Sequence, residues 1–326
     1  MHPAFSVIFL TTLLGAGQGL FLALFTAQSY ALFDLLPPQS GRTFYAFGSL
    51  MALVFLVAGL AGSFFHLGRP ERAWRAMAQW RTSWLSRETL VLPAFMGLVF
   101  LYGIAHWADW KPVVATLPSG IAVDATVVLG VLGTIVAFAL FVCTAMIYAC
   151  LPFLREWHSP LTVINYLLLG SASGFTLATA FSAFAATDLS RFFAAWAIII
   201  TLAACVSRGA SLVRNARLKP KSTLQTAIGI KHSRIAQKSQ GFMGGSFNTR
   251  EFFHGRTRFF LRSIKWLFVL GVFVAPIVLL TAALSGVSMT VSLLAFVIQY
   301  VGLIAERWFF FAEANHPQNL YYQAIA

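Results

Sequence analysis

The chain has 326 residues, of which 59% are hydrophobic and only 10% are charged, and its mean hydropathy is +0.77. Soluble globular domains carry about 25% charged residues, so this composition excludes a soluble domain and indicates an integral membrane protein. The formal net charge of +13 favours contact with anionic lipids or an acidic partner protein, and we expect no nucleic-acid partner. The first ten residues contain no Lys or Arg, so we expect no cleavable signal peptide.

Eight apolar runs are long enough to cross a bilayer as helices, which takes about 20 residues. Strand-like alternation, typical of membrane barrels, is absent. The predicted fold is therefore an all-α integral membrane protein with eight transmembrane helices, forming a single domain over residues 1–326. The sixth run is short, and we expect its helix to tilt little. The predicted spans are 5–34, 44–65, 88–107, 122–151, 163–187, 192–207, 266–284 and 288–311.

Glycines at GxxxG spacing occur in the first and fifth runs, at Gly15 and Gly19 and at Gly170 and Gly174. Small residues at this spacing let two helices approach closely, so they predict packing and say nothing about chemistry.

A long polar segment, 208–265, follows the sixth run. It is basic and lacks the apolar periodicity needed to fold alone, so we expect a loop that is ordered by a partner protein or by the membrane surface.

The distribution of positive charge predicts the orientation in the membrane. With eight spans, both termini lie on one side, and 20 of the 23 Lys and Arg residues fall on that side. Only Arg42, Lys111 and Arg191 fall on the other. Because Lys and Arg are enriched in cytoplasmic loops, we expect both termini and the 208–265 loop to be cytoplasmic.

Residues 66–90 contain five arginines and three tryptophans between two apolar runs. Pro70 suits the first position of a helix, and from there Ala73, Met77, Trp80 and Trp84 share one helical face. Arg72, Arg75 and Gln79 lie on the opposite face. This pattern predicts a short amphipathic helix in the membrane interface, between the second and third spans.

Two ionisable residues in this stretch, His66 and Glu88, mark the end of the second span and the start of the third. Ionisable groups at this depth are costly unless they face protein or a cavity. A histidine and a carboxylate can pass protons, which quinone chemistry requires. The alternative is that both side chains simply reach the surface from helix ends. Gln18, in the middle of the first span, either bonds across helices or reaches a ligand.

The other potential cofactor ligands argue against a bound metal group. None of the seven histidines lies in the middle of a span, which argues against haem b. Three cysteines, Cys143, Cys150 and Cys205, lie in apolar runs without a CxxC motif, so we predict no iron–sulfur cluster. Electrons must then come from another protein. A secondary transporter and a purely structural anchor are the alternatives; the former is disfavoured because polar residues gather at one surface and not at the midplane.

Three motifs together resemble the anchor subunits of the dimethyl-sulfoxide-reductase class of molybdoenzymes. They are His66-Leu67-Gly68-Arg69-Pro70 with Ser83-Trp84-Leu85-Ser86-Arg87-Glu88, Trp157-His158-Ser159-Pro160-Leu161-Thr162, and Glu306-Arg307-Trp308 followed by three phenylalanines. The resemblance covers the whole chain and implies a haem-free, eight-helix anchor in a bacterial cytoplasmic membrane. It also implies an iron–sulfur subunit and a molybdopterin subunit as partners, docked on the cytoplasmic face, with molybdenum and clusters held outside this chain.

The resemblance places the quinone site at His66 and Glu88, and we add Arg69, Trp84 and Gln18 as candidate contacts. With its basic 208–265 loop, the chain is most similar to the anchor of the cytoplasmic sulfite-oxidising, quinone-reducing complexes. It therefore implies sulfite oxidation coupled to reduction of ubiquinone or menaquinone. The alternative is the anchor of a reductase of the dimethyl sulfoxide type that oxidises menaquinol.

Overall fold

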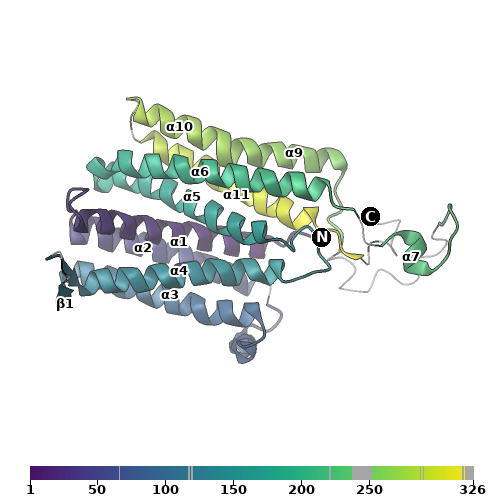
Figure 1. Ribbon diagram of the computed structural model, residues 1–326, viewed down its shortest axis with the longest axis horizontal. Helices are drawn as coiled ribbons and strands as arrows, with labels where there is room; N and C mark the ends of the chain where they lie inside the picture. Colours follow the sequence, from purple (N-terminus) through teal and green to yellow (C-terminus); the bar gives the residue numbers. More distant parts are fainter. Residues whose placement is uncertain are drawn as a thin grey trace.

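The computed structural model describes residues 1–65, 67–116, 118, 120–219, 222–236, 252–286, 288, 290–317 and 319. Eight helices in this part of the chain are long and apolar enough to cross a membrane, which confirms the predicted number. They run along one common axis and form an elongated bundle (Figure 1). The helices are α1 (Phe5–Leu32), α2 (Phe47–Phe64), α3 (Trp84–Trp107), α4 (Ala125–Ala149), α5 (Pro160–Ala185), α6 (Thr187–Ala216), the pair α9 (Arg258–Phe268) and α10 (Ala275–Leu284), and α11 (Val291–Glu313).

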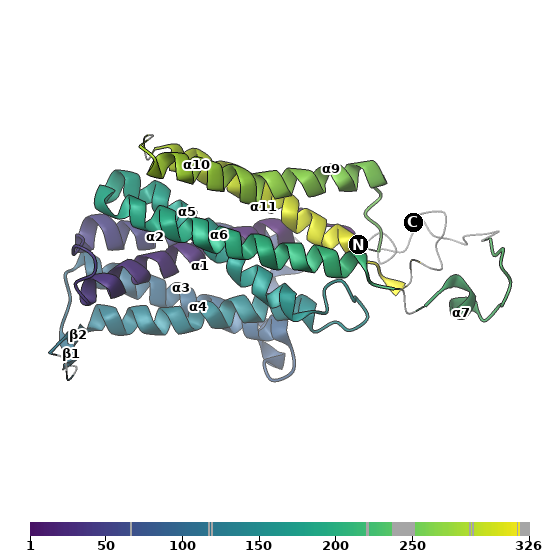
Figure 2. The ribbon, with the colours of Figure 1, turned by 45° about the horizontal axis from the view of Figure 1, so that its top comes forward.

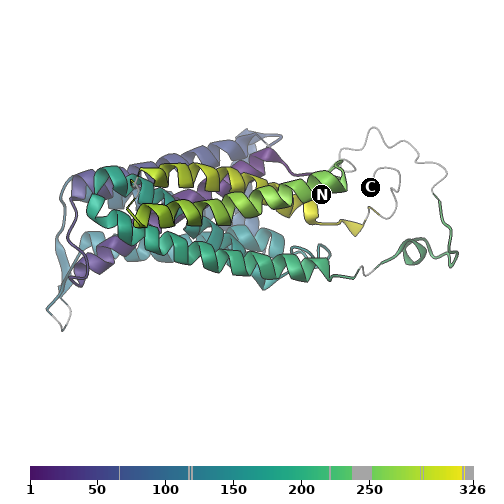
Figure 3. The same cartoon turned by 90° about the horizontal axis from the view of Figure 1, so that it is seen from above.

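The N-terminus and the last turn of α11 lie at one end of this bundle, which we call the terminus end (Figure 1). The short helix α7 (Leu224–Ile228) lies beyond this end, as the view from above also shows (Figure 3). At the opposite end is a hairpin of two antiparallel strands, β1 (Val113–Thr116) and β2 (Ala122–Asp124). Which end faces the cytoplasm stays a prediction from charge.

Two of the helices are entered through wider turns. A π-helical turn, η1 (Gly41–Ala46), leads into α2, and another, η3 (Val269–Val274), joins α9 to α10. Pro276 follows η3 and has no backbone N–H to donate to the preceding turn. The seventh span is therefore continuous in direction but irregular at its centre.

The most buried helices are α1 and α5, which lie side by side in the middle of the bundle (Figures 1 and 2). Their glycines face each other, because a Cβ atom at Gly19 would lie 2.9 Å from the Cα atom of Gly174. The predicted close approach is confirmed. A second pair was missed from the sequence: a Cβ atom at Gly302 of α11 would lie 2.7 Å from the carbonyl carbon of Gly271 in η3.

The sixth helix differs most from its prediction. It has 30 residues and is the longest in the described part of the chain, so the expected short span 192–207 is wrong. Its polar continuation is buried: Ser207 donates a hydrogen bond of 2.8 Å to Asn165 Oδ1, and Arg208 pairs with Glu306. A prediction from hydropathy ends the span at residue 207, but the helix continues because its next polar residues have partners inside the bundle.

The predicted loop 208–265 is correspondingly too long. Its first nine residues belong to α6, and α9 begins at Arg258, where the Thr257 side chain caps the helix by accepting from Phe260 N. Within it, α7 is a single short helix. Residues 220, 221 and 237–251 lie outside the described residues.

The stretch between the second and third spans contains a short 3₁₀ helix, η2 (Pro70–Gln79), all of which is exposed or partly exposed. Its Pro70 start is confirmed. Trp84 is not part of it but opens α3, where Ser83 Oγ accepts from the backbone of Ser86. Trp74 and Trp80 are 64% and 52% exposed. That they lie in a membrane interface stays a prediction.

Candidate functional site

Glu88 lies in the first turns of α3 and is buried, with 6% of its surface exposed. The Thr144 hydroxyl on α4 donates a hydrogen bond of 2.5 Å to Glu88 Oε1. The Ser83 cap fixes where α3 starts and so directs the Glu88 side chain toward α4. A carboxyl held in this way, near the terminus end of the bundle, is a group that can exchange protons with a neighbour.

Next to Thr144 is a small internal cavity formed by α1, α4, α5 and α11. Its volume is about 10 Å³, which is room for roughly one water molecule. The lining is unusually polar for the middle of a bundle, and a polar cavity of this size suits an ordered water. The polar side chains that line it are Thr11, Thr12, Gln18, Thr144, Tyr166, Ser173 and Arg307.

Gln18 bonds across helices, which is one of the two roles considered for it from the sequence; contact with a ligand stays a prediction. Its Nε2 donates a hydrogen bond of 3.1 Å to the carbonyl oxygen of Ala137 on α4, so it ties two helices together. It is 2% exposed and also lines the internal cavity.

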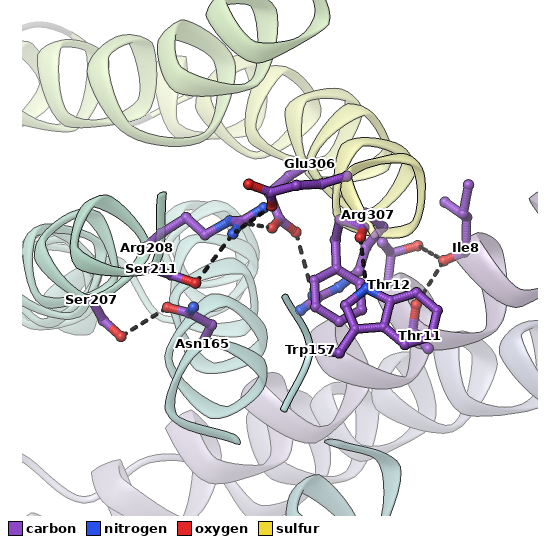
Figure 4. Close-up of polar contacts among 12 residues, drawn as sticks. Ile8, Thr11, Thr12, Trp157, Asn165, Ser207, Arg208, Ser211, Glu306 and Arg307 are labelled. Carbon is purple, nitrogen blue, oxygen red and sulfur yellow. Dashed lines mark hydrogen bonds and ion pairs between the residues drawn. The ribbon is translucent and has the colours of Figure 1, made fainter. Parts of the chain in front are cut away.

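Four charged residues on α6 and α11 form a second polar feature, which we call the buried ion cluster: Arg208, Glu306, Arg307 and Glu313. Arg208 Nε lies 2.7 Å from Glu306 Oε1, and Arg307 Nη1 lies 3.4 Å from Glu306 Oε2. Arg208 Nη1 lies 3.8 Å from Glu313 Oε2. Figure 4 shows Arg208 and Glu306 reaching toward each other from α6 and α11. Two positive and two negative groups balance, as burial of charge requires.

Aromatic rings complete the surroundings of this cluster. The Arg307 guanidinium lies 3.7 Å from the centre of the Tyr166 ring, and Arg208 lies 5.6 Å from the centre of the Phe268 ring. Cations are attracted to ring faces when water is excluded. Arg307 also lines the internal cavity, so it joins the ion cluster to the region of Glu88.

The Trp157 motif positions α11 against α5. Trp157 Nε1 donates a hydrogen bond of 2.9 Å to the Phe310 carbonyl oxygen, and the Thr162 hydroxyl donates one of 2.7 Å to the Trp157 carbonyl oxygen. Ser159 caps α5. These contacts fix the last turns of α11, where Glu306 and Arg307 lie (Figure 4).

Of the five predicted site residues, Gln18 lines the internal cavity, whereas Glu88 is not part of its lining but is hydrogen-bonded to Thr144, which is. Trp84 is partly buried and its ring lies 4.2 Å from the Arg87 guanidinium carbon. Arg69 is exposed at the start of η2. Neither lines the internal cavity. His66 lies outside the described residues, so its distance from Glu88 stays untested.

Sequence patterns did not identify Thr144, Arg208 or Arg307 as site residues. A hydroxyl in an apolar run carries no distinguishing signal. Arg307 could have been identified from the sequence, because it is a charged residue inside a predicted span. Glu306 and Glu313 both pair with arginines, and Glu306 is fully buried.

An open groove at the terminus end, about 460 Å³ in volume, separates α9 from α11. Arg262, Lys265 and Trp266 line it on one side, and Glu313 on the other. His254 also lines it; burial lowers the pKa of His254, and its Nδ1 accepts from the backbone of Arg256. The lining thus combines two cations and one carboxylate with aromatic and small side chains.

Comparison with known proteins identifies the family of the chain. Residues 1–312 match the protein family described as "DMSO reductase anchor subunit (DmsC)". The chain is also 59% identical, over the full length of both proteins, to a protein of Allochromatium vinosum that is named as a subunit of sulfite dehydrogenase. The chain belongs to the DMSO reductase anchor subunit family, and it is the membrane anchor of a multi-subunit oxidoreductase of the molybdoenzyme type.

Proposed function

We propose that this chain is the quinone-binding anchor of a sulfite-oxidising complex and passes electrons from an iron–sulfur subunit to quinone. The observation that carries the proposal is Glu88, a buried carboxyl hydrogen-bonded to Thr144 near the terminus end. The similarity to a protein named as a sulfite dehydrogenase subunit supports sulfite as the substrate of the molybdopterin subunit.

A bound quinone would accept two electrons and two protons. The internal cavity, at about 10 Å³, has no room for its ring. The ring is therefore expected on the other side of Glu88, toward η2, where Arg69 precedes η2 and Trp84 begins α3. His66, which lies outside the described residues, is proposed as a further contact from the sequence. Glu88 would deliver a proton to the ring oxygen nearest to it, and Gln18 would hold α1 and α4 in place behind it.

The orientation and remaining partners are part of the same proposal. We place the terminus end in the cytoplasm of a bacterium, because most Lys and Arg residues lie there. The groove with Arg262 and Lys265 then suits anionic lipid headgroups or an acidic face of the iron–sulfur subunit. The chain itself is expected to hold no haem, cluster or molybdenum.

The test is an assay of the native complex, purified through a tag on this chain. Sulfite-dependent quinone reduction is expected, and Glu88→Gln should lower it at least tenfold while reduction of a soluble dye by the catalytic subunits stays unchanged. Glu156→Gln, a half-buried loop carboxyl, is the matched control. Full quinone reduction in the Glu88 variant would refute the assigned role.

A second candidate is the anchor of a sulfoxide-type reductase, which the family description favours. In that direction quinol is oxidised and Glu88 accepts protons. The same preparation decides between them: quinol-dependent reduction of dimethyl sulfoxide without sulfite-dependent quinone reduction would select the reductase.

A further inference from the structure

The internal cavity is lined by the Arg307 guanidinium group and by the Thr144 hydroxyl, which is hydrogen-bonded to the Glu88 carboxyl group. Thr144 lines it from α4 and donates its only hydroxyl hydrogen to Glu88. Arg307 lines it from α11 and can only donate. A water molecule placed between them would accept from Arg307 and donate to Thr144 Oγ1, so that each hydrogen bond in the chain would point toward Glu88.

The cavity supplies the further partners that one water needs, which are two to four in total. Thr11 and Thr12 line the cavity and donate their hydroxyl hydrogens to carbonyl oxygens of α1, at 3.0 Å to Val7 and 2.8 Å to Ile8. Thr12 Oγ1 also lies 3.3 Å from the Tyr300 hydroxyl, which leaves two lone pairs on Thr11 and one on Thr12 as acceptors.

Arg307 is held in one place by its other contacts. It is 4% exposed, its guanidinium lies 3.7 Å from the centre of the Tyr166 ring, and it is 3.4 Å from Glu306. Because Glu306 also pairs with Arg208 at 2.7 Å, it is shared between two cations and neutralises Arg307 only in part.

We propose that a single water in the internal cavity links Arg307 to Thr144, and that Arg307 is a positioning residue which stabilises the carboxylate of Glu88. The inference rests on the proposed function, in which Glu88 gives a proton to a quinone oxygen that has received electrons from the iron–sulfur subunit. Glu88 then carries the negative charge until it takes a proton from solvent at the terminus end. Arg307 keeps its own proton throughout.

The other cation beside Glu88 is Arg87, which is only partly buried, whereas Arg307 is 4% exposed. No titratable side chain lies on α2, and the ionisable residues of η2 are exposed or partly exposed. Arg87, the neighbour of Glu88 on α3, donates to the carbonyl oxygens of Trp80 and Arg81. The remaining groups facing this region from α4, α5 and α11 are Cys143, Tyr148, Tyr166 and Glu306, none of which is a cation.

The experiment uses the full complex and follows quinone reduction from pH 5 to 10. Without the charge of Arg307, Glu88 holds its proton more firmly. In Arg307→Met we expect the alkaline limb of the kcat profile to move up by about one pH unit, with a lower kcat and an unchanged KM for quinone. Arg307→Lys should restore the native profile. Thr144→Val, which breaks the same link at nearly constant volume, should shift the profile in the same direction.

The matched control is Arg214→Met on α6. The Arg214 guanidinium donates hydrogen bonds to the carbonyl oxygens of Arg155 and His158 and to Asn215 Oδ1. The profile of this variant should match the native one even if the complex becomes less stable. If Glu88→Gln lowers quinone reduction but the Arg307→Met profile superimposes on the native one, the role of Arg307 alone is overturned, whatever the Thr144→Val profile. An unaffected Glu88→Gln would overturn the proposed function itself.

Discussion

The replacement Glu306→Gln tests the energetic role of the buried ion cluster. Glu306 is fully buried, with Arg208 at 2.7 Å and Arg307 at 3.4 Å. Glutamine keeps the size of the side chain but removes the charge. Two buried guanidinium groups would then share one carboxylate, Glu313, which lies 3.8 Å from Arg208.

Removing one partner from a buried ion pair costs roughly 3–5 kcal/mol, because an uncompensated charge stays in a medium of low dielectric constant. The energy of a neutral hydrogen bond, about 1 kcal/mol, is partly retained by the glutamine amide oxygen. We therefore expect a loss of about 3 kcal/mol in the free energy of unfolding. Most of this loss comes from the buried positive charge that no carboxylate then balances.

The assay is unfolding of the purified chain in mixed micelles of rising denaturing-detergent content, followed by tryptophan fluorescence. Glu156→Gln, the half-buried loop carboxyl, is the control and should change stability by less than about 0.5 kcal/mol. A double variant, Glu306→Leu with Arg208→Met, should recover most of the loss because charge balance returns. A loss below about 1 kcal/mol in Glu306→Gln would refute the reasoning, because a neutral hydrogen bond alone contributes about that much.

Three further replacements test the packing and the caps. Gly174→Ala should destabilise the bundle by about 1–3 kcal/mol, because a Cβ atom there would overlap the backbone of Gly19. Gly97→Ala is the control and should not destabilise the bundle, because the space around Gly97 is open. Unfolding in denaturing detergent compares the two variants. Asp124→Ala should cost about 1 kcal/mol, since the carboxylate caps α4 by accepting from two backbone N–H groups. Trp157→Phe should cost about 1 kcal/mol through the lost bond to α11, read from the same unfolding curves.

Hydropathy predicted the eight spans because each consists mainly of apolar side chains. Such side chains enter a membrane without needing a hydrogen-bond or charge partner elsewhere in the chain. Hydropathy failed at α6 for a specific reason. Arg208 ends the apolar run, but its partner Glu306 is almost 100 residues further along the chain. A charge is costly in a membrane only if unpaired, and no local window of sequence contains that pair.

The candidate site was likewise predictable only where a single residue in the sequence gave the signal. Glu88 was identified because a carboxyl at the start of a span needs an explanation. Its bond to Thr144 depends on how α3 packs against α4, and the approach of Arg307 depends on α11 packing against α5. These are properties of the assembled bundle, so no sequence pattern indicated the internal cavity.

The distribution of charge along the helices bears on how protons reach a quinone. Helices α1, α4 and α5 contain no Asp, Glu, Lys, Arg or His, and on α11 all three charged residues lie in the last eight positions. On α3, Glu88 and His106 are 18 residues apart, which is about 27 Å along a helix. Among the buried hydroxyls of α5, those of Ser173, Thr176 and Thr179 donate to their own helix, and that of Ser182 lies within hydrogen-bond distance of the Thr179 carbonyl oxygen and of Ser190 Oγ.

On these five helices the charged side chains near Glu88 lie toward the terminus end, so in the proposed function we expect protons to reach Glu88 from that end. Electrons from a docked iron–sulfur subunit would arrive at that same end in the proposed complex. Quinone reduction would then take protons and electrons from one side of the membrane, and the chain would couple the two without moving charge across the bilayer.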